Sequence, residues 1–256
     1  MINGWDIDFL YRAFLIFLRL GALLFFIPIF EGKGVPVMFR AGFALLFTGI
    51  IAMSVPDRPV LPAHVLGLVL AGFNELLLGL FMGLVVRVAF QTVSMAGEMI
   101  SIEGGFMRDA SFDPASQMSG PVAQKMLFQF AIVVFLVTGM HLEVFSSFLK
   151  SFEVAHLGVW LPSPGAVTGL IAQTAQIFTV SVQMAAPFIA MNFVINATFA
   201  VLGKAVPQMN VFMTSFAVMI AAGLLIMVFT LDVVAQYVVS LLKDSAFNLL
   251  HLLQAH

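Results

Sequence analysis

The sequence contains no cysteine and few charged residues, with 11 Lys and Arg and 13 Asp and Glu among 256 residues. The missing cysteine excludes disulfides, thiolate metal sites and cysteine nucleophiles. Charged residues make up 9% of the chain, whereas roughly 25% is usual in soluble proteins. The formal net charge of -2 leaves no basic surface for electrostatic binding of nucleic acid, so we expect no nucleic-acid partner.

Hydrophobic residues make up 61% of the chain, and the mean hydropathy is +1.08. These values are typical of an integral membrane or membrane-complex protein in contact with lipid. Asp6 and Asp8 stand before the first apolar run, where a secretory signal peptide would carry positive charge, and no small-residue cleavage site follows. We therefore expect the first hydrophobic segment to be retained.

Long apolar segments predict an all-α fold of about six hydrophobic helices, arranged as helical hairpins in a single unit covering residues 1–256. Three of them run to about 40 residues, although about 20 residues suffice to cross a bilayer. Such segments either bend back as hairpins or continue beyond the bilayer into an assembly that covers them. The predicted helices cover residues 7–30, 37–55, 61–103, 121–152, 164–205 and 209–253.

A polar loop at 104–121, which begins with two glycines, separates the third and fourth apolar segments. Lipid cannot satisfy loose peptide groups, so an irregular segment at membrane depth must be buried in protein or line a water-filled cavity. This makes the loop a candidate plug, with an ordinary loop at the membrane surface as the alternative. Its apolar side chains could form a deformable seal. The candidate plug residues are Gly105, Phe106, Met107, Phe112, Asp113, Pro114 and Met118.

Small and polar residues recur every three or four positions along the third segment, close to the helical period. This pattern predicts a small or polar stripe, in which a GxxxG pair permits close helix approach. Charged groups in such a helix should face a partner, a cavity or each other. Three alternatives stay open for the stripe: it packs within this chain, it packs against other subunits, or it faces a conduit. The stripe comprises Glu75, Gly79, Gly83, Arg87, Gln91, Ser94, Glu98 and Ser101. All of these except the two serines are candidate site residues.

Catalytic and cofactor motifs are missing from the sequence. There is no HExxH metal motif, no phosphate-binding G-x-x-x-x-G-K-[ST] loop and no G-x-S-x-G nucleophile setting. We therefore expect neither enzymatic activity nor a bound metal or cofactor. Lys and Arg are distributed too evenly between the two sets of connections to assign an orientation. The histidines are scattered at His64, His141, His156, His251 and His256.

Several short motifs, taken in order, cover essentially the whole chain. They include Gly83-Leu84-Val85-Val86-Arg87, Gly104-Gly105-Phe106, Phe112-Asp113-Pro114 and Pro207-Gln208-Met209-Asn210. In this order and spacing the chain resembles the FliR/SctT family of type III secretion export-gate subunits, with the flagellar branch closer. Lys204 departs from the arginine that is common before the last motif. The motif residues Pro207, Gln208 and Asn210 are candidate site residues of that family.

The resemblance implies a non-enzymatic subunit that co-assembles with FliP and FliQ, with FlhB alongside, in the inner membrane at the flagellar basal body. Such a complex encloses a gated pore for unfolded export substrates, and the loop at 104–121 is the plug of the closed pore. The alternative is a secondary transporter of a small solute, whose signature would be inverted repeats and broken helices. In that case Glu75, Arg87 and Glu98 could serve a proton or substrate path, and Pro187 could break a helix.

Overall fold

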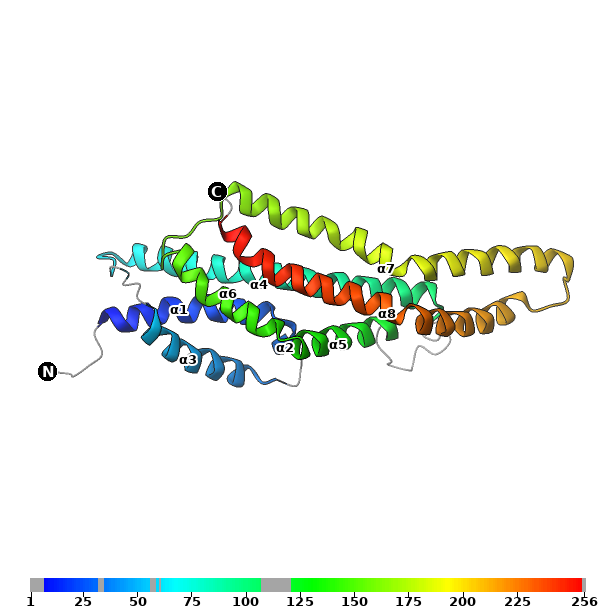
Figure 1. Cartoon of the computed structure of the whole chain (residues 1–256), viewed down its shortest axis with the longest axis horizontal. Coiled ribbons are helices and arrows are strands. Elements are labelled where there is room, and N and C mark those ends of the chain that lie inside the picture. The colour runs from blue at the N-terminus through cyan, green and yellow to red at the C-terminus, as the bar shows by residue number, and fades with distance from the viewer. Residues whose placement is uncertain (1–6, 32–34, 56–58, 60, 107–120, 255–256) are drawn as a thin grey trace. The chain divides into compact units, whose positions relative to one another are not determined.

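The computed structural model describes residues 7–31, 35–55, 59, 61–106 and 121–254, and all regular structure within them is α-helical (Figure 1). Five helices are long and apolar enough to cross a membrane, or six if one bent pair is a single span. The predicted all-α membrane fold is thereby confirmed. The helices are α1 (Ile7–Phe26), α2 (Pro28–Glu31), α3 (Val37–Ser54), α4 (Val65–Glu103), α5 (Val122–Val137), α6 (Met140–Val154), α7 (Pro164–Ala205) and α8 (Val211–Gln254).

The segment expected as one helix over 121–152 is interrupted in the structure. Helices α5 and α6 meet at an angle of 66°. Gly139, which precedes α6, has φ +74°, in the left-handed region that glycine adopts without steric cost. A residue in this conformation cannot continue a right-handed helix, so the chain bends there.

The chain divides into two compact units, each containing parts of α4, α7 and α8. The first unit comprises residues 1–89, 136–173 and 242–256, and the second comprises residues 90–135 and 174–241.

In the first unit, α1 packs on α3 and on the first half of α4. Leu15, Leu20 and Leu23 of α1 are fully buried. An aromatic contact links α3 to α6, because the rings of Phe47 and Phe145 stack with their centroids 5.9 Å apart. Because lipid tails are as apolar as these side chains, such contacts stabilise the unit mainly through van der Waals packing between the helices.

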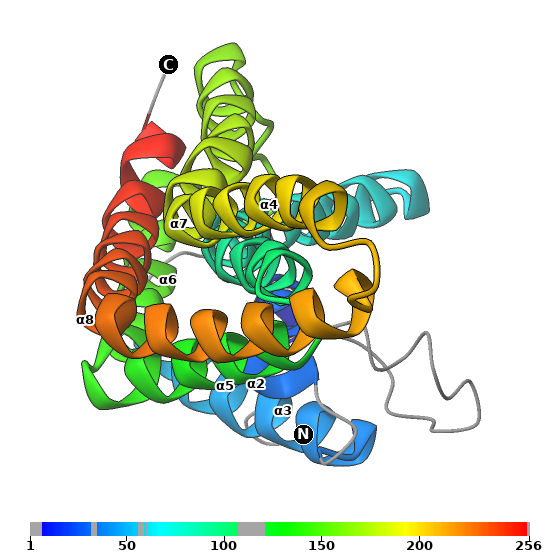
Figure 2. The ribbon, with the colours of Figure 1, turned by 90° about the vertical axis from the view of Figure 1, so that its right-hand side faces the viewer.

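In the second unit, the remainder of α4 packs on α5, and α7 and α8 form a helical hairpin (Figure 2). The hairpin core contains Met191, Ile195 and Phe199 of α7 and Met219 of α8. Helix α4 is continuous from Val65 to Glu103, and its last part, residues 90–103, belongs to this unit.

The long helices differ in how much of their surface the chain itself covers. In α4, 56% of an apolar 18-residue window is buried, compared with 17% in each of α7 and α8. Helix α7 has 42 residues, or about 63 Å at about 1.5 Å per residue, which is about twice the hydrocarbon thickness of a bilayer. The apolar surface of α7 and α8 is thus mostly left for contact with molecules other than this chain.

Candidate functional site

The candidate plug begins with a turn at the end of α4. The N–H of Gly104 donates to the carbonyl of Ile100 at 2.8 Å, and the N–H of Gly105 donates to that of Ile102 at 3.2 Å. Gly105 has φ +78°, a conformation that strains any side-chain-bearing residue. The pair of glycines therefore ends the helix and sets the direction in which the following segment leaves it.

Helix α8 packs directly against this turn. A Cβ atom added to Gly105 would lie 3.1 Å from Cγ of Met219, and one added to Gly223 would lie 2.9 Å from the carbonyl oxygen of Gly104. The Phe106 ring would lie 3.2 Å from the same added atom at Gly223. Glycine at 223 therefore permits the close approach of α8 to the start of the candidate plug.

Helix α7 contacts the same region through polar groups. Nδ2 of Asn192 donates a hydrogen bond to the Glu103 carboxylate, and Nδ2 of Asn196 donates to Oδ1 of Asn192 at 2.6 Å. Hydrogen bonds to a carboxylate are stronger than neutral ones. The last residue of α4 is thus tied to α7, while the glycines after it pack on α8.

Of the candidate plug residues, the structure describes Gly105 and Phe106. The seal that the sequence predicts within the loop stays a prediction, because its other members lie outside the described residues: Met107, Phe112, Asp113, Pro114 and Met118.

The first stripe residue, Glu75, is buried and paired with Arg19 of α1. Nε of Arg19 lies 2.5 Å from Oε2 of Glu75, and the two side chains are 1% exposed or less. The guanidinium also donates to Oγ of Ser151 at 3.0 Å and to the carbonyl of Ala155 at 3.1 Å, and it lies 4.3 Å from the Phe152 ring centroid. Each nitrogen of the buried guanidinium therefore has a hydrogen-bond partner, as burial of a charge requires.

Gly79 and Gly83, the GxxxG pair, face α1 as well. A Cβ atom at Gly79 would overlap the carbonyl oxygen of Arg19, and one at Gly83 would lie 2.8 Å from Cβ of Phe26. Arg87 continues this side of α4 and lies with its guanidinium 5.9 Å from the Phe26 ring centroid. This half of the stripe packs within the chain.

The second half of the stripe differs, since Gln91 and Glu98 are exposed. Successive steps of four residues advance about 400°, so each step rotates the position by about 40° around the helix. The two serines of the stripe are buried against α5: Ser94 accepts a hydrogen bond from Nε2 of Gln124 at 2.7 Å, and Ser101 accepts one from a backbone N–H in the first turn of α5. Contact of Gln91 and Glu98 with a partner stays a prediction.

The motif residues Pro207 and Gln208 lie exposed in the connection between α7 and α8. Asn210 has a defined structural role, because its Oδ1 accepts a hydrogen bond from the N–H of Met213 at 3.3 Å. It is the N-cap of α8, and asparagine is among the residues preferred there.

Arg19 was not among the residues singled out from the sequence, although a signal was present. It is the only charged residue between positions 13 and 30. A charge in the middle of an apolar segment calls for a partner, and the partner proves to be Glu75.

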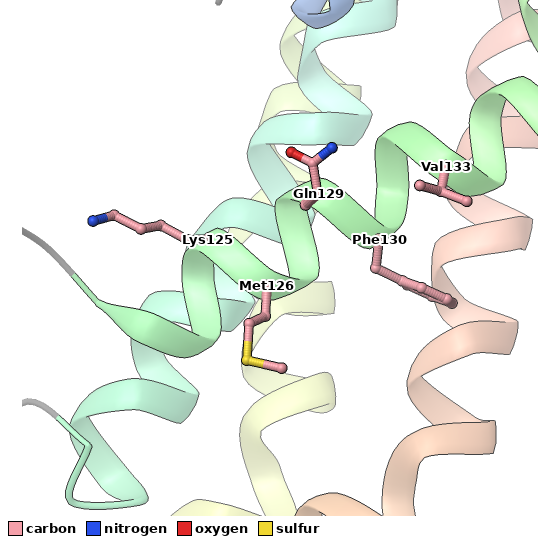
Figure 3. Close-up of a pocket in the computed structure, with 5 residues that line it drawn as sticks. All are labelled: Lys125, Met126, Gln129, Phe130 and Val133. Atoms are coloured by element: carbon pink, nitrogen blue, oxygen red, sulfur yellow. The ribbon is translucent and has the colours of Figure 1, made fainter.

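An open pocket of about 540 Å³ lies along α5, and none of its lining residues is a predicted site residue. Figure 3 shows that its lining side chains come from one helix, with Met126 and Phe130 projecting in the same direction. Among the described residues, no group of three His, Asp or Glu side chains is placed to hold a metal ion. The lining residues are Lys125, Met126, Gln129, Phe130 and Val133.

Long apolar helices, a fully paired buried charge and a polar segment entered through a glycine turn define an integral membrane protein of the α-helical class. The chain belongs to the family described as bacterial export proteins, family 1, which matches residues 10–245. The resemblance to FliR/SctT proteins is thereby confirmed.

Flagellar biosynthetic proteins FliR are among the relatives that match over most of their length. The chain is 28% identical to that of Escherichia coli, over 91% of this chain and 88% of the relative. It is 28% identical to that of Bacillus subtilis, over 95% and 96% of the two chains. With that of Caulobacter vibrioides it shares 27% identity over 88% and 90%.

Proposed function

We propose that the protein is a non-enzymatic subunit of the flagellar type III protein export gate, located in the bacterial inner membrane at the basal body. It co-assembles with FliP and FliQ, with FlhB alongside, and the complex encloses a channel for unfolded flagellar substrates. The observation that carries this proposal is the match to FliR proteins over nearly the whole chain.

The exposure of α7 and α8 supports co-assembly. Both helices exceed the length needed for one crossing, and only 17% of each apolar window is buried within this chain. The surface of α7 also carries the exposed polar side chains of Asn196 and Thr198. Partner helices can cover such a mixed surface, whereas lipid provides no hydrogen-bonding groups for amide side chains.

The loop at 104–121 helps to close the channel until a substrate displaces it. The described start of the loop supports this role, because Glu103 is tied to α7 and Gly104 packs on α8. A plug needs such a fixed base so that its side chains reach the same place each time the pore closes. Since the chain has no nucleotide-binding motif, partner proteins supply the energy for export.

Deletion of residues 106–118 tests the role of the loop. We expect the variant complex to assemble and to conduct small ions in planar bilayers, because the seal is lost while Glu103 and Gly104 are kept. A Gly and Ser segment of equal length at 106–118 is the matched control for chain connectivity and should leak as well. Unchanged conductance in an assembled deletion complex would contradict the plug, and solute uptake by the chain alone in liposomes would favour the transporter.

A further inference from the structure

The connection between α6 and α7, residues 155–163, contacts both members of the buried ion pair through its backbone. The carbonyl of Ala155 accepts a hydrogen bond from Nη2 of Arg19 at 3.1 Å. The N–H of Gly158 donates to Oε1 of Glu75 at 2.6 Å. The positive partner therefore meets a backbone acceptor and the negative partner meets a backbone donor.

We infer that Arg19 and Glu75 are positioning residues that hold this connection by the orientation of their charges, and not only by pairing with each other. An ion pair that served only to join α1 to α4 would function with its charges in either order. Here each charge has a second, polar partner on the connection, and the two partners differ in sign. Exchange of the charges would set a carboxylate against the Ala155 carbonyl and a guanidinium against the Gly158 N–H.

The hydrogen bonds of the pair divide its polar atoms between the two partners, α6 and the connection. Oε1 of Glu75 accepts both from Gly158 and from Nη2 of Arg19, at 2.6 and 3.0 Å, while Oε2 accepts from Nε. Oγ of Ser151 accepts a hydrogen bond from Nη1 of Arg19, and the Phe152 ring lies against the face of the guanidinium. In a site that excludes water, loss of the connection would leave a charged atom with fewer partners, which is costly.

Further contacts fix which side of the connection faces inward. Nδ2 of Asn74 donates to the carbonyl of Gly158 at 3.1 Å, and Gly158 has φ +80°. A Cβ atom on Gly158 would lie 3.1 Å from Cβ of Ala71. As a result Leu157 is 4% exposed and Val159 is 74% exposed, although they stand two residues apart.

Cysteine labelling tests the inference directly, because the chain contains no cysteine of its own. Leu157→Cys and Val159→Cys are introduced singly into the full chain, in native membranes with its partners present, and their rates of reaction with a maleimide are compared. We expect the cysteine at 157 to react at least about tenfold more slowly than the one at 159, as protection by local structure predicts.

The charge exchange Arg19→Glu with Glu75→Arg is then combined with each cysteine. We expect the cysteine at 157 to react within about threefold of the one at 159 in this background. The exchanged pair still has opposite charges, but it no longer forms the hydrogen bonds to Ala155 and Gly158 that hold the connection. Protection at 157 equal to that of the parent would overturn the inference.

Asn74→Ala provides a milder variant, which leaves the ion pair in place and removes one hydrogen bond to the connection. Loss of one such bond should raise the labelling rate at 157 by about threefold. The matched control is Phe73→Ala, at an exposed neighbouring position, which should leave the rate unchanged. An unchanged rate in Asn74→Ala would contradict the contribution of this one hydrogen bond. If the charge-exchange protein fails to accumulate, Glu75→Gln takes its place, because it removes the negative charge that the Gly158 N–H meets. Protection at 157 equal to that of the parent in Glu75→Gln would overturn the inference.

Discussion

Gly79 is the position at which the packing of α1 on α4 is most sensitive to an added methyl group. A Cβ atom there would overlap the carbonyl oxygen of Arg19 and lie 2.7 Å from Cβ of Ala22. Backbone atoms cannot turn aside as a flexible side chain can. Gly79→Ala must therefore separate the two helices close to the buried pair of Arg19 and Glu75.

The size of the effect follows from two opposing contributions. Alanine is favoured over glycine inside a helix by about 1 kcal/mol. Overpacking of a well-packed site costs about 1–3 kcal/mol, and contact with backbone places Gly79 near the upper end. We expect a net loss of about 2 kcal/mol in the free energy of unfolding, which corresponds to a fall of about 4–8 °C in Tm for a chain of this size.

Gly49→Ala in α3 is the matched control, because an added Cβ atom there meets nothing within 4 Å. It should gain about 1 kcal/mol from helix propensity and raise Tm by about 2–4 °C. The assay is thermal unfolding of the purified protein in one detergent, followed by far-ultraviolet circular dichroism. Equal shifts in the two variants, or a rise in Tm for Gly79→Ala, would refute the close approach of α1 to α4.

Three further predictions concern other sites. Gly223→Leu should displace the turn at Gly104 and make the assembled complex conduct small ions in planar bilayers, and a tight seal would contradict this. Asn210→Ala should destabilise α8 by about 1 kcal/mol through loss of the cap to Met213, measured as amide hydrogen exchange in its first turn; unchanged exchange would argue against the cap. Glu98→Leu should lower recovery of the full complex on native gels if this exposed side chain meets a partner, and normal recovery would remove it from the interface.

The helical class and the length of the apolar segments followed from composition and periodicity alone. The bend between α5 and α6 did not, because apolar residues continue on both sides of Gly139 and a single glycine is tolerated inside many helices.

The members of the small and polar stripe on α4 could be predicted from the sequence, but which of them are buried and which are exposed could not. Spacing alone indicated that Glu75 and Glu98 belong together, yet one is buried and the other is exposed. The slow rotation of a four-residue repeat around the helix accounts for the difference. The pairing of Glu75 with Arg19 spans 56 positions in the chain, and no local pattern encodes a contact at that separation.

The most direct test of the proposed function is the native mass and composition of the complex that the protein forms. The chain carries a C-terminal tag, membranes are extracted in mild detergent, and the purified material is analysed by native mass spectrometry. We expect a large hetero-oligomer that contains two other small hydrophobic subunits. A well-behaved monomer or small homo-oligomer would contradict it.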